Sequence, residues 1–238
     1  MKTTRMSLIA LICLFSMTFV ACREDGPLTV TLSEEDVADI VEYAVSAETG
    51  GMVEQLETSA EMAESFINSI PCGQQKDSTL SFSNQTGSRF TYDYDVSWEW
   101  ALTCNAFSIP DSFELSFAAN GNYETLRMTS DDESVYDFTL KGLKLSDPDL
   151  IYNGNLTRGG DQEAKVRNKN TFSSDLEIST TDLKISKSNQ EISSGTAIVK
   201  LDATLSGGTK QSFSGKLTFL GNQAATFEVN GMTFNLNW

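Results

Sequence analysis

The feature that most constrains the fold is a strict alternation of apolar and polar side chains from Arg89 to Cys104. Successive side chains of a β-strand point to opposite faces of its sheet, so the alternation predicts one long strand with a buried face and a solvent face. The run exceeds the usual strand length of about 3 to 10 residues, and we therefore expect a β-bulge or strong curvature in it. The side chains expected on the buried face are Phe90, Tyr92, Tyr94, Val96, Trp98, Trp100 and Leu102.

The same two-residue period continues from Thr79 to the C-terminus. The last two alternating runs meet at Asn230-Gly231, which matches the two-residue turn of a β-hairpin. Consecutive strands with short connections predict an antiparallel meander. Further turn signals stand at Asn120-Gly121, Asp131-Asp132, Asp147-Pro148, Gly159-Gly160, Gly207-Gly208 and Gly221-Asn222.

Ahead of the strands, the apolar period is that of an α-helix. Ser33 and Asp36 have the spacing of a capping box, which predicts a helix that begins at Glu34. Gly50-Gly51 interrupts the first apolar stripe, and Pro71 ends the second. The stripes comprise Val37, Ile40, Val41, Ala44 and Val45, and then Val53, Leu56, Ala60, Ala63, Phe66, Ile67 and Ile70.

These patterns predict a single domain of the α+β class over residues 33–238. Its N-terminal helices, within residues 33–70, are expected to pack on a large curved antiparallel β-meander formed by residues 78–238. This layout resembles the half-barrels of periplasmic lipoprotein carriers of the Lol type, in which a curved sheet wraps around helices.

The N-terminus carries the pattern of an export signal. Lys2 and Arg5 precede an apolar run of about 13 residues, Leu8 to Val20, which is too short to cross a bilayer as a helix, since that takes about 20 residues. The sequence that ends at Cys22 resembles a bacterial lipobox, in which the cysteine thiol is acylated and becomes the new N-terminus. Residues 1–21 are then a lipoprotein signal peptide, and residues 22–32 an acylated tether that attaches the protein to a membrane. The alternative is an ordinary signal peptide that contains a cysteine.

Arg23, Glu24 and Asp25 follow this cysteine directly. A lipidated cysteine with acidic residues next to it resembles the export signal of surface lipoproteins in the Bacteroidota. The remainder of the chain is also similar to uncharacterised lipoproteins of that group, with an acidic helical start, a cysteine pair and a final Asn-Gly hairpin. The resemblance implies an outer-membrane lipoprotein exposed at the cell surface, and it implies no activity.

Two cysteines remain once Cys13 and Cys22 are assigned to the export signal. An even pair in an exported protein predicts a disulfide between Cys72 and Cys104, and it would join the end of the second helix to the inner face of the sheet. The alternative is a two-cysteine metal site. The chain has no histidine to complete such a site, so we expect no metal there.

The charge of the chain limits its partners. It has 17 Lys and Arg against 33 Asp and Glu, and removal of residues 1–21 would change the net charge from −16 to −18. Nucleic acids and anionic membranes are poor partners for such a surface. The sequence has neither a phosphate-binding glycine loop nor a nucleophile elbow, so we expect no cofactor.

The absence of histidine removes the usual triads and general bases. Asp93, Asp95 and Glu99 share the polar face of the long strand and are the candidates for glycoside hydrolysis, although a solvated sheet face explains them as well. Two acidic groups, Asp131-Asp132-Glu133 and Asp147 with Asp149, could hold calcium or be simple turns.

Basic residues cluster at one place in this acidic chain. They are Arg158, next to Gly159-Gly160, and then Lys165, Arg167 and Lys169. This group could bind an anionic glycan or the acidic surface of a partner. The alternative is an edge strand that lysines protect from pairing with other chains.

The sequence as a whole favours a lipid-anchored, non-enzymatic binding or interaction module whose partner is a protein, a glycan or a lipid. A second hypothesis is a carrier of lipids or other apolar ligands, whose sheet would enclose a cavity of about 300 Å³ or more. A glycan-directed hydrolase is the third.

Overall fold

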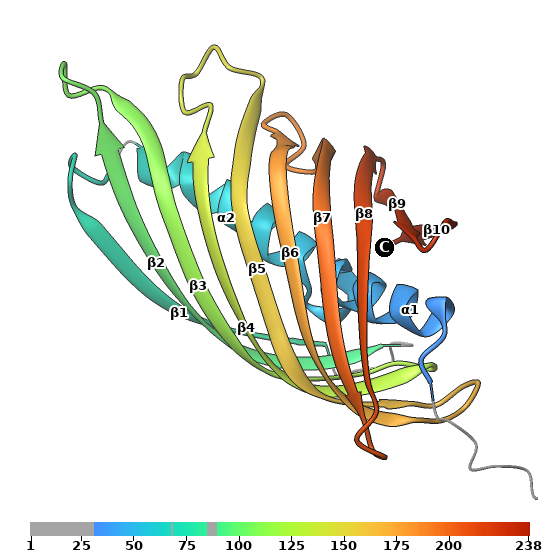
Figure 1. Cartoon of the computed structure of the whole chain (residues 1–238). Helices are drawn as coiled ribbons and strands as arrows, with labels where there is room; N and C mark the ends of the chain where they lie inside the picture. The colour runs from blue at the N-terminus through green and yellow to red at the C-terminus, as the bar shows by residue number, and fades with distance from the viewer. Residues whose placement is uncertain (1–30, 68, 85–89) are drawn as a thin grey trace, which may run out of the picture.

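The computed structural model describes residues 31–67, 69–84 and 90–238. These residues form ten β-strands and, before them, two α-helices joined by a short 3-10 helix (Figure 1). The helical segments are α1 (Glu34–Val45), η1 (Ala47–Thr49) and α2 (Met52–Ile67). The strands are β1 (Gln75–Asn84), β2 (Thr91–Cys104), β3 (Pro110–Glu124), β4 (Met128–Lys141), β5 (Asp149–Ala164), β6 (Thr171–Ser186), β7 (Ile192–Leu205), β8 (Lys210–Gly221), β9 (Ala224–Val229) and β10 (Met232–Asn237).

The strands form a single open antiparallel sheet in the order β1 to β10, so each strand pairs with its neighbours in the sequence. The sheet is strongly curved, and both helices lie against its concave side (Figure 1). The predicted antiparallel meander with helices at its N-terminus is confirmed. The α+β class is confirmed only in part, because strands contain most of the described residues and the domain is mainly β.

The N-terminal helix begins where the capping box predicts. Ser33 Oγ accepts a hydrogen bond from the backbone N–H of Asp36, and the Asp36 carboxylate accepts one from the backbone N–H of Ser33. Gly50 then takes a left-handed conformation, with φ 68°, at the end of η1, and α2 starts two residues later. A left-handed residue favours glycine because a Cβ atom is strained there, which explains the position of the predicted interruption.

Three of the predicted turns are wrong, because they lie inside strands. Asn120-Gly121 belongs to β3, Asp131-Asp132 to β4 and Gly159-Gly160 to β5. A Cβ atom on Gly121 would lie 2.0 Å from the carbonyl oxygen of Asp93, and one on Gly160 would lie 2.3 Å from that of Asp131. These glycines therefore mark a close approach of neighbouring strands rather than a turn.

The other turn predictions are confirmed. Asp147-Pro148, Gly207-Gly208 and Gly221-Asn222 lie at strand connections, and the last hairpin turns at Asn230 and Gly231, with φ 49° and 80°. Positive φ at both central residues is the mark of a type I′ hairpin turn. The long strand β2 has its register shift at its end, between Thr103 and Cys104, and it follows the curvature of the sheet.

Candidate functional site

The concave face of the sheet is filled by side chains of the helices. Phe66 of α2 meets the Trp100 ring edge-on, with ring centroids 5.4 Å apart. The hydroxyl of Tyr152 lies 2.9 Å from Ser59 Oγ of the same helix. The apolar stripes of both helices and the inner side chains of β2 to β9 form one buried cluster. The inner face is therefore the core of the domain.

Aromatic rings run across this inner face from strand to strand. Trp98 stacks on Phe117, and Phe117 stacks on Tyr136, with centroid distances of 4.5 Å and 3.9 Å. Trp98 and Trp100 of β2 are also stacked, as the alternation in the sequence places them on one face. These contacts join β2, β3 and β4 through side chains as well as through the backbone.

A buried ion pair lies among these rings. The Arg158 guanidinium donates to the Asp132 carboxylate at 2.8 Å and to the backbone carbonyl of Tyr43 at 3.3 Å, and both charged side chains are almost fully buried. Arg158 also donates to the Tyr94 hydroxyl. Burial alone would lower the pKa of Arg158, but the negative charge of Asp132 raises it well above the ordinary value. Hydrogen bonds through Ser130, Gln162 and Ser174 extend this network along the inner face.

This pair corrects one prediction from the sequence. We expected Arg158 in an exposed anion site or on an edge strand. Instead it points inward from β5, which lies in the middle of the sheet and pairs with β4 and β6. Its partner Asp132 comes from a different strand, and no local pattern in the sequence links the two residues.

The remaining basic residues lie in the connection between β5 and β6 rather than on an edge strand. Arg167 forms ion pairs with Asp36 and Asp39 near the start of α1, and Arg127 pairs with Asp39 at 3.2 Å. Burial raises the pKa of Asp39, while both arginines act to lower it. These contacts fasten the start of α1 to the loops at one end of the sheet.

Three further contacts involve Lys165 and the start of the described chain. Lys165 Nζ pairs with Glu124 at 2.5 Å, whereas Lys169 is exposed. The side chain of Asn170 donates to the carbonyl of Thr31 at 3.2 Å, and the backbone N–H of Leu32 donates to Gln211 Oε1 at 2.7 Å. The chain therefore enters the domain at the end of the sheet that holds the β5–β6 and β7–β8 connections.

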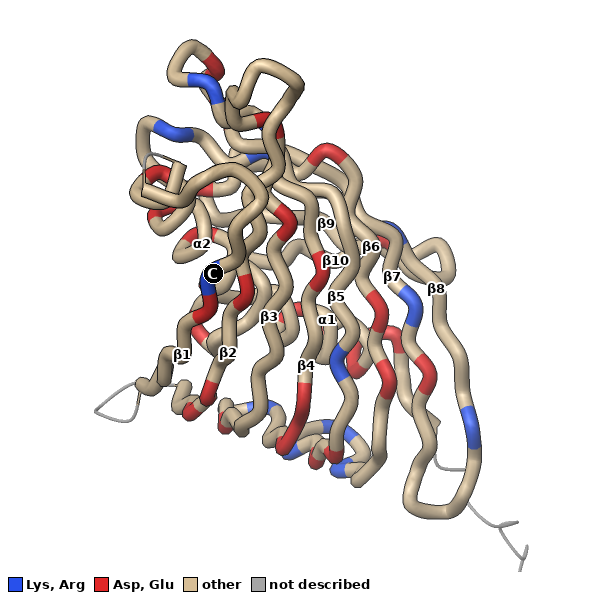
Figure 2. Tube along the Cα trace, turned by 90° about the vertical axis from the view of Figure 1, so that its left-hand side faces the viewer, with Lys and Arg blue, Asp and Glu red and all other residues tan. Residues whose placement is uncertain are grey.

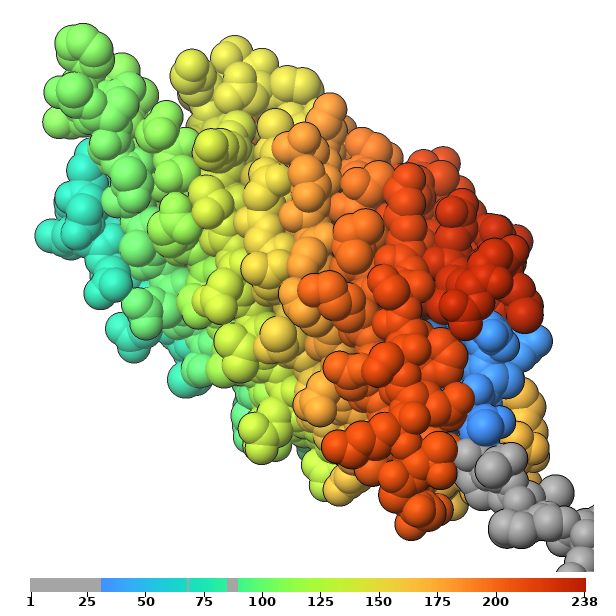
Figure 3. All heavy atoms as spheres, in the orientation of Figure 1, coloured from blue at the N-terminus to red at the C-terminus, as the bar shows by residue number. Residues whose placement is uncertain are grey.

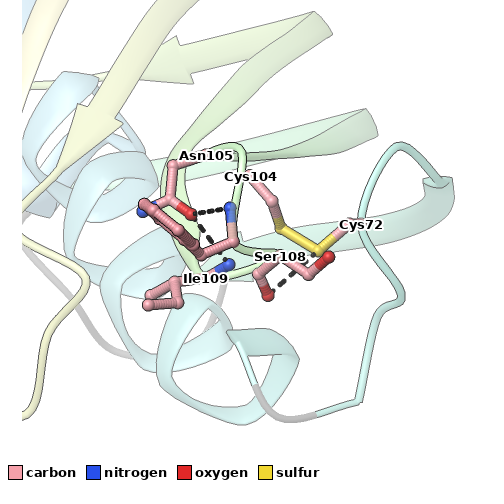
Figure 4. The surroundings of a disulfide bond; sticks show 6 residues. Cys72, Cys104, Asn105, Ser108 and Ile109 are labelled. Atoms are coloured by element: carbon pink, nitrogen blue, oxygen red, sulfur yellow. Dashed lines mark hydrogen bonds between the residues drawn. A yellow bond between two sulfur atoms is a disulfide. The ribbon is translucent and has the colours of Figure 1, made fainter.

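The predicted disulfide between Cys72 and Cys104 is present, with the two Cα atoms 5.6 Å apart (Figure 4). It joins the segment after α2 to the last residue of β2, and a backbone hydrogen bond from Gly73 to Leu102 runs beside it. Cys104 is half-buried against the core, whereas Cys72 is exposed. In the loop that follows, the Asn105 side chain accepts from the backbone N–H groups of Phe107 and Ile109.

The candidate carboxylates of β2 lie on the outer face, where all three are exposed. Asp95 accepts a hydrogen bond from Ser81 Oγ at 2.7 Å, and Glu99 accepts one from the side chain of Gln75 at 3.0 Å. Asp93 lies on the same face. Cross-strand hydrogen bonds therefore occupy two of these groups, and Asp95 and Glu99 line two separate hollows rather than one shared site.

Acidic residues also line a shallow outer hollow of about 870 Å³ over β4 to β7, where Gly159 contributes no side chain. Figure 2 colours the acidic residues along these strands red, and Figure 3 views the outer side of the sheet. The carboxylates around the hollow belong to Asp131, Glu133, Asp161, Asp175, Glu177 and Asp202. Asp132 lies on the opposite face, so the carboxylates of residues 131–133, one of the two groups considered for calcium, do not come together. Among the described residues, no three metal-binding side chains are grouped so that they could hold an ion.

Cys22, Arg23, Glu24 and Asp25 lie outside the described residues, as does the signal peptide. Within residues 31–67, 69–84 and 90–238, none of the helices has the length and hydropathy needed to span a bilayer. Comparison with protein-family models, with curated proteins and with solved structures found no significant match to this chain.

Proposed function

We propose that this protein is a lipid-anchored, non-enzymatic binding module of the bacterial envelope, attached by acyl chains on Cys22 and exposed at the outer membrane surface. The observation that carries the proposal is the filled concave face. Because helix side chains occupy it, the surfaces left for a partner are the outer face, the edges and the loops. The Cys72–Cys104 disulfide supports export, since such bonds persist in oxidising compartments.

The place where the described chain enters the sheet supports presentation to a partner. The chain enters at the end of the sheet that holds the β5–β6 connection, and the loops β2–β3 and β4–β5 lie at the opposite end (Figure 1). Strand β5 has 16 residues, and at about 3.3 Å per residue it spans roughly 50 Å. The far loops expose Phe107 (84%), Ile109 (49%) and Leu145 (102%), which are apolar contacts available to a partner.

The two competing functions have less support. A carrier needs an apolar cavity between helices and sheet, and here Phe66, Ser59 and their neighbours occupy that space. A glycoside hydrolase needs two carboxyl groups that flank a bound sugar, usually in a groove. Asp95 and Glu99 instead line two separate hollows of the exposed outer face, and each accepts a hydrogen bond from the adjacent strand.

Lipid attachment is tested with Cys22→Ser in cells that process lipoproteins, with Cys13→Ser as the matched control inside the signal peptide. The native protein and the control should incorporate labelled palmitate and stay with the membrane. Cys22→Ser should neither incorporate palmitate nor stay with the membrane. Exposure at the cell surface is tested by adding protease to intact cells, which should digest the native protein. Membrane retention of Cys22→Ser would refute the lipid anchor.

The binding mode is tested separately by native mass spectrometry of the protein extracted from the membrane. If the concave face is filled, the native and denatured masses should agree once the acyl chains are counted. Extra mass that disappears on denaturation would favour the carrier instead.

A further inference from the structure

The two edges of the open sheet are unlike, and one of them is closed by the protein itself. Strand β10 has only 6 residues and packs beside α1. The Glu42 carboxylate of α1 accepts a hydrogen bond from the backbone N–H of Asn237 at this edge, and the Asn230 side chain donates to Glu34 at 3.1 Å. A short strand covered by a helix is a poor template for another chain.

The opposite edge, β1, lacks these protections. Its 10 residues pair with β2 from Gln75 to Asn84 without a register shift, and its other side has no strand partner among the described residues. It contains no proline, and its only charges are Lys76 and Asp77 at one end. Figure 1 shows β1 at the margin of the sheet, away from β10. A long, regular edge with few charges readily accepts another strand.

Burial along β1 shows which side an added strand would complete. Leu80 and Phe82 face the core but are only half-buried, whereas Val96 and Trp98 on the neighbouring β2 are 2% exposed. The inner apolar layer is therefore unfinished at this edge. A strand placed beside β1 would cover the exposed part of Leu80 and Phe82, because β1 would then have a neighbouring strand on both sides, as β2 has.

We propose that β1 pairs antiparallel with β1 of a second copy of this chain, about a two-fold axis at Leu80. On the inner face Leu80 then meets its own counterpart, and Ser78 lies opposite Phe82. On the outer face Asp77 lies opposite Ser83. This register keeps every apolar side chain on the core side, because opposed residues in an antiparallel pair point to the same face. It also brings no two like charges together.

Pairing of β1 with β1 gives a closed dimer, to which no further copy can be added in the same way. The same strand is used by both copies, so the contact is isologous, and the covered β10 edges leave no second site for growth. Pairing β1 with β10 of another copy would instead give an open-ended fibre, and the α1 contacts of β10 oppose that. The dimer goes beyond the proposed binding function, and it does not depend on lipid attachment.

The register is tested by cysteine cross-linking of the full chain in membranes. Directly opposed residues have Cα atoms about 4.5 to 5.5 Å apart, within reach of a disulfide. Leu80→Cys should therefore give a covalent dimer under mild oxidation, and the matched variant Ser83→Cys, opposite Asp77, should give much less. Absence of a dimer with Leu80→Cys, equal yields from both variants, or cross-linking to a different protein would overturn the proposal.

Introducing a lysine at the same two positions tests the dimer without oxidation. Leu80→Lys sets two lysines against each other across the axis, whereas Ser83→Lys places a lysine opposite Asp77. By light scattering of the detergent-extracted protein, the native chain and Ser83→Lys should have dimer mass and Leu80→Lys monomer mass, with folding checked by circular dichroism. A monomeric native chain, or a Leu80→Lys variant that remains dimeric, would refute this interface.

Discussion

Arg158 and Asp132 are buried, although the sequence pattern predicts an exposed basic group for the first and an acidic turn for the second. Both lie within strands of an acidic chain, yet their ion pair is enclosed by the helices and the tyrosines of the inner face. The positive charge also faces the ring of Tyr123, 5.1 Å from its centroid. Burial raises the pKa of Tyr94 far above its usual range, so its hydroxyl stays neutral beside the pair.

Replacing Arg158 with Met should destabilise the protein by about 3 to 5 kcal/mol, because it leaves the Asp132 carboxylate buried without its counter-charge. Equilibrium unfolding in urea measures this loss. The double variant Arg158→Met with Asp132→Leu removes both charges and should recover part of the stability. If the double variant is less stable than the single one, the pair is not the source of the effect.

Gly121 offers a test of the close strand contacts. A methyl group there would lie 2.0 Å from the Asp93 carbonyl oxygen, which belongs to the backbone and has little room to move. We expect Gly121→Ala to cost about 1 to 3 kcal/mol in the same unfolding experiment. Gly207→Ala is the control, since a Cβ there meets nothing within 4 Å, and its stability should stay within about 0.5 kcal/mol of the native value.

The last hairpin, β9 and β10, joins the helices to the sheet. Leu236 of β10 is 2% exposed, and the N–H of Asn237 bonds to Glu42 of α1. Deletion of residues 235–238 removes both contacts together with part of the β9–β10 pairing. We predict that the truncated protein does not fold cooperatively, as judged by thermal unfolding. An unchanged melting temperature would contradict this, and the exposed-site control Asn235→Ala should behave as the native protein does.

The elements differ in how far the sequence predicted them. The capping box at Ser33 and the alternation in β2 are local patterns. Because local hydrogen bonds set the start of α1 and burial of one face sets the alternation of β2, the sequence predicts both elements correctly. Gly121 and Gly160 were read as turns because glycine is permissive in either setting, and only the neighbouring strand shows which one applies. The candidate site was less predictable. The disulfide followed from cysteine number, whereas the partners of Arg158 and Arg167 are set by the folded chain.

Across the molecule, four acidic residues of the helices are removed from solvent: Asp39 is buried, and Glu42, Glu54 and Glu57 are half-buried. Burial is the main reason that the pKa values of Asp39, Glu42, Glu54 and Glu57 are all raised. A raised carboxyl pKa means that the folded state binds more protons than the unfolded state between the two pKa values. Stability therefore falls as the pH rises through that window.

Glu57 gives the pH test, because its pKa is raised from 4.5 to about 7. The native protein should lose stability between about pH 4.5 and 7, and Glu57→Gln should flatten this dependence while its Oε1 still accepts from the N–H of Ile192. Thermal unfolding over this range measures the slope. Glu64→Gln, at an exposed position of α2, is the control, and an equal flattening by both variants would contradict the assignment to Glu57.

The strand order also has a consequence for how the chain reaches its folded state. Every strand pairs with the next one in the sequence, so each new hairpin closes a short loop and the sheet can grow in the order of synthesis. The helices and the Cys72–Cys104 bond all belong to the first 104 residues. A chain that is synthesised N-terminus first would therefore pack its helices on β2 first and then add β3 to β10 one at a time. Formation of the sheet would then begin before the C-terminus is made, and the last hairpin would complete the fold.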